Sequence, residues 1–288
     1  MVVSLNMESA PAVTEDIVDY VTKLNNAVMD VPIPPTSQNG EVGPVSGCDV
    51  VNRLINVLSK LQTITKKHKP EDYTGCRFGN KAHTAWLKEV REMWIEIAEE
   101  VGITCPDASL SNKIMENFLN SFGSDRIDYG TGHEIQFAYF MSGLTRLGLV
   151  AEENLCDVVL HVFSRYFEFV RYLIDRYNLE PAGSKGAWGL DDFQFLPFLL
   201  GSAQLVSNID IAPATVVKHG ECSPHKSSYI FIQAIEYVKE KVNGIPLNIS
   251  SPMLNGICTS CTWRQINNGL MKMYKDDIVN ISRIKHAC

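Results

Sequence analysis

The stretch from Glu152 to Tyr177, EENLCDVVLHVFSRYFEFVRYLIDRY, is the part of the sequence that decides the fold class. Its apolar residues fall on most sides of a helical wheel instead of along one stripe, which is typical of a helix buried inside a globular protein. No run in the chain has the unbroken apolar stretch of about 20 residues that a membrane span requires. The sequence therefore predicts a long helix at the centre of the protein.

Helical periodicity continues on both sides of this segment. A first helix is expected from the apolar face of Ile17, Val18, Val21, Leu24 and Val28, with Thr14 as N-cap and Glu15 and Asp16 in the first turn. Further helices are expected over 50–64 and 81–101, and loops over 31–47, 123–132, 180–190 and 243–261. Because no stretch alternates with period two between hairpin turns, we predict an all-α protein.

Composition and charge argue against some classes of function. The chain has 288 residues, 45% of them hydrophobic and 20% charged, with a net charge of −7, which argues against phosphate-backbone recognition and hence against a nucleic-acid partner. The first residues lack the basic flank and apolar stretch of a signal peptide. Since the eight cysteines are scattered among helical patterns, we expect reduced thiols in a cytoplasmic or nuclear protein that binds no membrane.

The first motif is Arg126–Glu134, RIDYGTGHE, which opens a helical pattern. Thr131 and Glu134 have the spacing of a capping box, in which each side chain bonds the backbone amide of the other residue. Gly130 and Gly132 would leave the amides at the positive end of this helix uncovered, which suits an anion.

Arg126 and Asp128 allow two interpretations of this motif. Arg126 could clamp a phosphate with two hydrogen bonds while Asp128 favours a cation beside it. Alternatively, the two side chains only pair with each other, and Thr131 and Glu134 only cap a helix. The local pattern favours the second interpretation, because short glycine patterns are weak indicators.

The second motif is Pro181–Pro197, PAGSKGAWGLDDFQFLP. Its glycines allow sharp turns around Trp188, and Asp191 or Asp192 is expected to cap the next helix with help from Gln194. The adjacent carboxylates beside an aromatic wall could hold a metal ion or a peptide. Equally well, the motif could be a capped helix whose aromatic residues, Trp188, Phe193 and Phe195, belong to the core.

Cysteines and histidines give a weaker indication of a site. The pairs Cys258–Cys261 and Cys222–His225 could supply four zinc ligands, but chance spacing is the favoured interpretation. Four histidines are isolated in the sequence and are expected to be packing residues: His83, His133, His161 and His219.

Further segments occur in the same order as in a known family. Arg77–Ala82 and Trp86 precede the two motifs, and Ser251–Leu254 and Asn268–Tyr274 follow them. From about residue 14 to about 280, the chain resembles the serine/threonine protein phosphatase 2A activator family, also called the phosphotyrosyl phosphatase activator family. The motifs at 126–134 and 186–197 are the most specific part of this resemblance.

The resemblance implies a fold and a function. It implies one multi-helix domain over 14–288, after a tail over 1–13, with core, lid and linker parts around a deep cleft. It implies an activator or chaperone that binds the catalytic subunit of type 2A phosphatase, with or without its scaffold subunit. ATP and Mg²⁺ would assist, and the protein would also isomerise proline-containing peptides as a peptidyl-prolyl cis-trans isomerase (EC 5.2.1.8). The alternatives are a phosphatase-binding module without catalysis and a zinc-stabilised helical scaffold.

Carried over by motif, the resemblance also implies roles for residues. Those expected to contact the nucleotide are Arg126, Thr131 and Gly132. Those expected to bind magnesium are Gly186, through its carbonyl, and Asp192. Trp188 and Asp191 are implied in isomerisation, and the residues expected at the peptide or phosphatase are Ala187, Trp188, Asp191, Pro252 and Met253.

The chain departs from the family pattern at three places. Ile249 and Ser250 stand where the family usually has Glu-His, and Leu200 stands where it commonly has tryptophan. The sequence ends at Cys288, where family members continue into an aromatic and glycine-containing tail. We therefore expect weaker nucleotide binding than in members with the tail.

Overall fold

The computed structural model describes residues 10–35, 45–70, 79–104, 108–182, 190–218, 223–242 and 244–287. Nearly all of the regular structure in these ranges is helical, which confirms the all-α prediction, and the only strands described there are two of two residues each. None of the described helices is long and apolar enough to cross a membrane.

The first half of the chain forms a bundle around the predicted central segment. Its elements in chain order are α1 (Ala10–Ala27), α2 (Asp49–Ile64), α3 (Ala82–Glu92), α4 (Trp94–Val101), α5 (Ala108–Leu119), η1 (Asn120–Phe122), β1 (Asp128–Tyr129), α6 (Thr131–Arg146), η2 (Glu152–Asn154), α7 (Leu155–Asp157), η3 (Val158–Phe163), α8 (Ser164–Tyr177) and β2 (Glu180–Pro181).

The second half forms a smaller group of helices beside this bundle. Its elements are α9 (Leu196–Ala203), α10 (Pro213–Val216), η5 (Ser223–His225), α11 (Ile230–Lys241), α12 (Leu247–Ser250), α13 (Pro252–Ser260) and α14 (Trp263–Ala287). α9 packs against both α11 and α14, and so holds the second group together.

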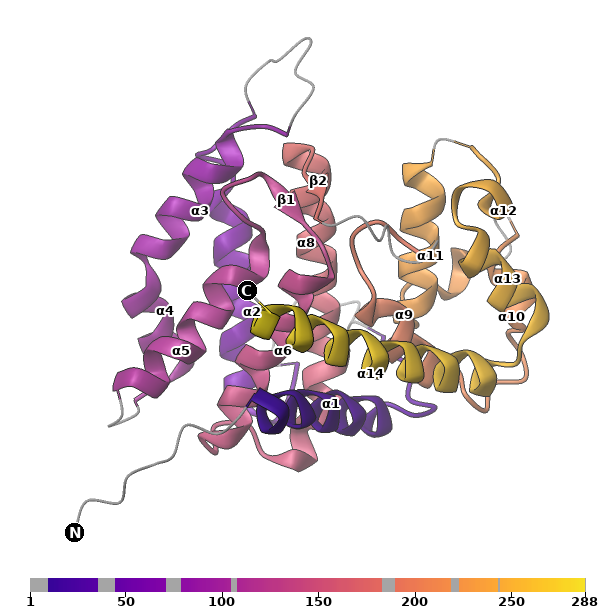
Figure 1. The fold of residues 1–288 in the computed structure, drawn as a ribbon, viewed down its shortest axis with the longest axis horizontal. Helices are drawn as coiled ribbons and strands as arrows, with labels where there is room; N and C mark the ends of the chain where they lie inside the picture. The colour runs from indigo at the N-terminus through magenta and orange to yellow at the C-terminus, as the bar shows by residue number, and fades with distance from the viewer. Residues whose placement is uncertain are drawn as a thin grey trace.

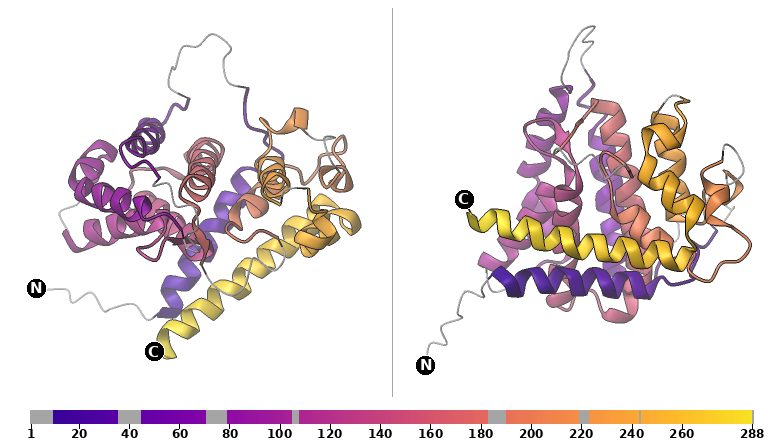
Figure 2. Two further views of the ribbon diagram at one scale, coloured as in Figure 1. Left: turned by 90° about the horizontal axis from the view of Figure 1, so that it is seen from above. Right: turned by 45° about the vertical axis from the view of Figure 1, so that its right-hand side comes forward.

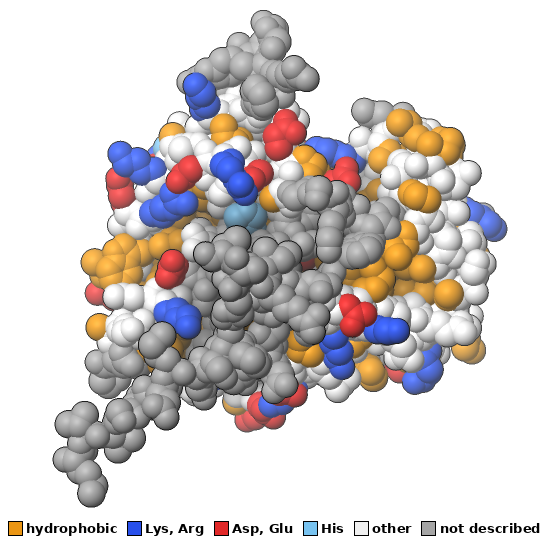
Figure 3. All heavy atoms as spheres, viewed as in Figure 1, with side chains coloured by type: hydrophobic (Ala, Val, Ile, Leu, Met, Phe, Trp, Pro, Cys, Tyr) orange, Lys and Arg blue, Asp and Glu red, His pale blue; other side chains and the backbone are white. Residues whose placement is uncertain are grey.

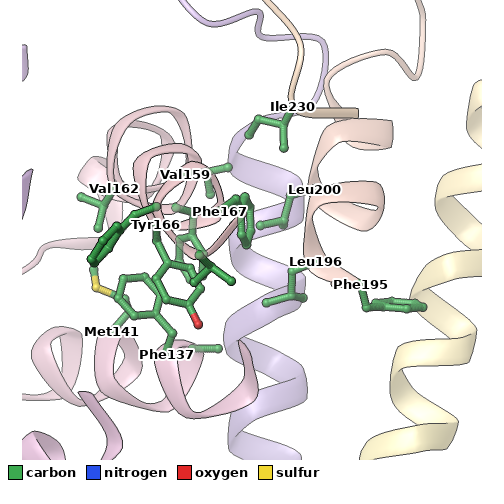
Figure 4. Close-up of a cluster of buried hydrophobic side chains, with 14 of the residues drawn as sticks. Phe137, Met141, Val159, Val162, Tyr166, Phe167, Phe195, Leu196, Leu200 and Ile230 are labelled. Carbon is green, nitrogen blue, oxygen red and sulfur yellow. The ribbon is translucent and has the colours of Figure 1, made fainter. Parts of the chain in front are cut away.

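The predicted central helix is present as the continuous run from η2 to α8. Within it, η3 is a π-helix, the rarer helical form whose hydrogen bonds span five residues, and five of its six residues are buried. Phe137 stacks on Tyr166 with ring centroids 3.8 Å apart, and this pair lies at the centre of the aromatic core (Figure 4). The fully buried residues of the run include Val158, Val159, Phe163, Phe167, Phe169 and Leu173.

The two end helices, α1 and α14, lie side by side along the base of both groups and run in opposite directions (Figures 1 and 2). Their buried contact includes two hydrogen bonds between the side chains of Asn25 and Asn267, of 3.2 and 2.8 Å. Asn267 also donates to the Leu199 carbonyl and the Ser202 hydroxyl of α9. These amide contacts join the start, the end and the middle of the chain.

α9 and α11 approach each other most closely at Gly201. A Cβ atom at this position would lie 2.2 Å from the backbone nitrogen of Phe231 and 2.7 Å from its Cα. Only a residue without a side chain fits there, because the obstructing atoms belong to backbone.

Three sequence predictions about helix boundaries are wrong. Thr14 is not an N-cap, because α1 begins at Ala10 and places Thr14 inside the helix. The helix expected over 81–101 is broken at Met93, so that α3 packs on α8 while α4 packs on α2. The loop expected over 243–261 contains α12 and α13, since Pro252 stands in the first turn of α13, where a missing N–H is not needed.

Candidate functional site

The two motifs singled out in the sequence lie next to each other in the fold. β1 and β2 pair in parallel, with Asp128 opposite Glu180 and Tyr129 opposite Pro181. Just beyond the pair, the Ala182 N–H donates to the Tyr129 carbonyl at 2.7 Å. This short bridge connects the first motif to the start of the second, and its strands are too short to produce a period-two pattern in the sequence.

Glu134 makes a second connection between the motifs. Its Oε2 accepts the N–H groups of Phe195 and Leu196, at 2.8 and 3.0 Å. The predicted capping box with Thr131 is therefore wrong: no side chain caps α6 in the described structure, and the Glu134 carboxyl instead caps the start of α9. The reason is that Glu134 points into the core, where the first amides of α9 need an acceptor.

A buried polar cluster surrounds this carboxyl. On α8, Arg171 donates from Nε to Gln194 Oε1 at 2.8 Å, and its guanidinium lies 5.5 Å from the centre of the Tyr237 ring. Glu134 Oε1 and one terminal nitrogen of Arg171 have no hydrogen-bond partner within the part of the chain that the structure describes. Sequence reasoning did not single out Arg171, although it falls among the apolar residues of α8 that face the core, such as Phe167 and Ile174, and this was a usable signal.

Burial dominates the electrostatics of the cluster. It raises the pKa of Glu134 to about 8, against the opposing effects of the two N–H donors and Arg171. It also raises the pKa of Asp191 to about 6, although the Phe193 N–H and Arg171 favour the ionised form. At neutral pH, Glu134 is therefore mostly a neutral acid and Asp191 mostly a carboxylate.

The loop before β1 has a strained backbone. Ile127 has φ of 61°, a value that a β-branched residue rarely adopts. Its carbonyl accepts the Glu180 N–H at 2.9 Å, and Asp128 accepts from the Ser124 hydroxyl. Arg126 pairs with Asp128 at 3.0 Å, as one of the two interpretations expected, but its side chain stays 80% exposed and so remains accessible to a ligand.

The start of α6 is open. Thr131 is half-buried, Gly132 is exposed, and a Cβ atom on Gly132 would meet nothing within 4 Å. Gly130 has a different role, because a Cβ there would lie 2.7 Å from the Ala182 carbonyl oxygen and would push β1 and β2 apart. An uncapped helix start beside an exposed arginine can bind an anion.

The second motif is only partly described. Gly186, Ala187 and Trp188 lie outside the described residues. Asp191 is half-buried and accepts the Phe193 N–H at 3.2 Å, and Asp192 is exposed. Neither caps the next helix as predicted, because α9 begins only at Leu196 and is capped by Glu134. The aromatic side chains Phe193 and Phe195 are buried, and Phe195 points toward α14 (Figure 4).

Pro252 and Met253 lie in the other part of the molecule. They open α13, and α11 stands between α13 and α8 in the views of Figures 1 and 2. Pro252 is exposed and Met253 is half-buried. Figure 3 shows hydrophobic side chains on this side of the molecule. Ile245, just before α12, and Ile249, inside it, are 52% and 69% exposed.

The other candidate ligands do not form a site in the described structure. Cys258 is buried in α13, which raises the pKa of its thiol to about 12, and Cys222 lies outside the described residues. No three His, Cys, Asp or Glu side chains gather to hold a metal ion in the described ranges. His83 and His133 donate to the backbone carbonyls of Phe122 and Asn120, as packing residues do.

Similarity to known proteins agrees with this geometry. The family model described as phosphotyrosyl phosphate activator (PTPA) protein matches residues 7–287. The chain belongs to the PTPA family. The resemblance inferred from the two motifs is thereby confirmed.

Individual PTPA-family proteins show how far the similarity extends. The chain is 33% identical over 271 residues to the serine/threonine-protein phosphatase 2A activator of Drosophila melanogaster, covering 92% of this chain and 64% of that protein. With activator 1 of Schizosaccharomyces pombe it shares 36% identity over 236 residues, covering 80% and 71%. A crystal structure of the PP2A phosphatase activator Ypa1 superimposes with a TM-score of 0.78 at 28% identity, covering 92% and 85%.

The chain spans less than two thirds of the first of these relatives. It covers 64% of the fly protein and 58% of activator 2 of Neurospora crassa.

Proposed function

We propose that this chain is an activator of type 2A serine/threonine protein phosphatase, acting on the catalytic subunit alone or with its scaffold subunit in the cytoplasm and nucleus. Membership of the PTPA family and the names of its relatives support the proposal. The structural observation that carries it is the joining of the two family motifs by the β1–β2 pair and by Glu134.

ATP and Mg²⁺ are the cofactors proposed for the joined motifs. The residues fit a nucleotide: the start of α6 is uncapped, Gly132 is exposed, and the Arg126 side chain, in the loop that leads into α6, is 80% exposed. Arg126, Thr131 and Gly132 would hold the phosphates, and Asp192 and the Gly186 carbonyl would hold the cation. Because Mg²⁺ takes most of its ligands from water and phosphate, one exposed carboxylate from the protein is enough. When bound, ATP would supply the phosphate groups and Mg²⁺ would neutralise much of their negative charge.

Prolyl isomerisation is proposed as the catalytic activity. Rotation about an X-Pro bond needs no nucleophile, only a site that lowers a barrier of about 18–20 kcal/mol by favouring the twisted imide. Trp188 and Asp191 are the residues proposed to act on the peptide, with Ala187 beside them. Pro252 and Met253 open α13, which packs on α12 with its exposed Ile249, and they are proposed to contact the phosphatase.

Two measurements separate this proposal from its alternatives. The phosphatase catalytic subunit should be retained by the immobilised protein and gain serine/threonine phosphatase activity when Mg²⁺ and ATP are added. A short proline-containing peptide should isomerise faster in its presence. Retention without faster isomerisation would indicate a non-catalytic binding module, and failure to retain the phosphatase would refute the proposed function.

Replacing Arg126 with alanine should weaken Mg-ATP binding about tenfold or more, because a charge-assisted contact to phosphate is worth about 1.5–3 kcal/mol. Stability should change by less than about 1 kcal/mol, since the ion pair with Asp128 is exposed on the arginine side. Titration calorimetry measures the affinity, with Arg264→Ala on an exposed position of α14 as the matched control. Equal affinities of Arg126→Ala and wild type would rule out this nucleotide contact.

The adjacent carboxylates Asp191 and Asp192 should have different functions. Asp192→Asn should weaken Mg-ATP binding and leave phosphatase retention nearly unchanged, because Asp192 is exposed and proposed to face the cation. Asp191→Ala should impair isomerisation and phosphatase activation with little effect on nucleotide affinity. Thermal melts of both variants should accompany the assays. If each variant only melts earlier and otherwise behaves like wild type, the two residues are structural.

A further inference from the structure

Glu134 connects the proposed phosphate contacts at the start of α6 to the segment that carries the proposed peptide residue Asp191 and the proposed cation ligand Asp192. It lies at the fourth residue of α6, whose first two residues are the proposed phosphate contacts Thr131 and Gly132. Its carboxyl reaches the Phe195 and Leu196 amides, which directly follow the turn made by Asp191 with Phe193. One side chain thus spans from the first motif to the second.

The connection is stiff, because every part of it is buried. Glu134 is 1% exposed, and Phe195 and Leu196 are 4% and 1% exposed. The first N–H groups of a helix have no partner within the helix, so the Glu134 oxygen satisfies donors that would otherwise be buried without one. A shift of the α6 start therefore displaces the start of α9 or breaks both hydrogen bonds.

We propose that Glu134 is a positioning residue that transmits occupancy of the α6 start to the Asp191–Leu196 segment. This inference rests on the proposed nucleotide site. It goes beyond that site because it assigns the coupling between the two segments to Glu134, a residue that contacts neither the nucleotide nor the peptide. Two sites are coupled when a ligand at one changes the free energy of ordering the other.

Amide hydrogen exchange of the intact protein, with and without Mg-ATP, tests the coupling directly. In wild type, Mg-ATP should slow amide exchange over residues 128–136, where it is proposed to bind. It should also slow exchange over residues 193–199, by at least about fivefold, which is the lower end of usual allosteric coupling. In Glu134→Met, which removes the acceptor and keeps an apolar chain of similar length, residues 128–136 should still be protected and residues 193–199 should no longer respond.

Three further variants complete the experiment. Glu134→Gln keeps an acceptor oxygen in place and should restore most of the response at 193–199. Glu134→Asp keeps a carboxyl group but is one methylene shorter, so it should lose the response and can replace the methionine variant if that one does not fold. Glu168→Gln, at an exposed glutamate on α8, should behave like wild type.

The outcomes distinguish this inference from the proposed function. Protection at 128–136 without protection at 193–199 in wild type would overturn the inference and leave the nucleotide site intact. An undiminished response in Glu134→Met or Glu134→Asp would also overturn it. If Mg-ATP protects neither segment of wild type, the proposed nucleotide site fails and the coupling fails with it, whereas phosphatase retention is tested separately.

Discussion

Gly201→Ala is expected to lower the free energy of unfolding by about 3 kcal/mol, or roughly 5 °C in Tm for a chain of 288 residues. The new methyl group would lie 2.2 Å from the Phe231 nitrogen and 2.9 Å from the Ile230 carbonyl carbon. Both obstructing atoms are backbone, so no side-chain rotation can relieve the clash. The helices α9 and α11 would have to separate, and their shared core would lose its packing.

Gly256→Ala is the matched control for this substitution. Gly256 lies inside α13, and a Cβ atom there would meet nothing within 4 Å. Alanine should stabilise that helix by about 0.4–1 kcal/mol by reducing the entropy of the unfolded chain. Thermal or urea unfolding of the two variants gives the comparison. A Gly201→Ala protein as stable as Gly256→Ala would show that α9 and α11 are not as close as described.

Glu134→Gln should become progressively more stable than wild type as pH rises. Burial raises the folded-state pKa of Glu134 to about 8, above the ordinary value of 4.5 that applies in the unfolded chain. Between these values, wild type must take up a proton to fold, so its stability falls with rising pH through this window. From pH 6.5 to 8, the variant should gain about 1.6 kcal/mol over wild type, because the slope falls from about 1.4 kcal/mol per pH unit to about half of that at the folded-state pKa.

The groups that face Glu134 do not reverse this sign. Asp191 is already ionised above its pKa of about 6, and Arg171 stays charged. Burial keeps the pKa values of the neighbouring tyrosines above the range, at positions 129, 166 and 274. Urea unfolding at several pH values measures the slope, and Glu168→Gln should run parallel to wild type. A Glu134→Gln curve that also runs parallel would mean that the carboxyl titrates normally.

Local patterns were sufficient to predict the helices of this fold but not their ends. The run from Glu152 to Tyr177 shows its central position through its apolar residues, because burial on most sides of a helix leaves a clear compositional trace. The break at Met93 cannot be seen in the sequence, since the residues on both sides keep a helical repeat of apolar positions. The helix axis changes direction there only because α3 and α4 pack against different helices. Pro252 does not reveal the start of α13 in the sequence, because a proline in a first helical turn resembles one in a loop.

The sequence was sufficient to locate the candidate site but not to predict the hydrogen bonds that hold it together. The motifs at 126–134 and 181–197 were found from the sequence, and the structure places them together. The role of Glu134 was missed because its partners are about 60 residues away, and a nearby Thr131 offered a plausible local alternative. The same holds for β1 and β2, which are joined by hydrogen bonds across a separation that no short pattern encodes.

The pairing of α1 with α14 has a consequence for synthesis of the protein on the ribosome. Asn25 and Asn267 are separated by 242 residues, so α1 emerges long before its last partner exists. At about 5–20 residues per second, the delay is roughly 10–50 s. During that time the apolar stripe of Ile17, Val21 and Leu24 lacks part of its cover. A nascent chain of this protein is therefore a natural client for chaperones until α14 has left the exit tunnel.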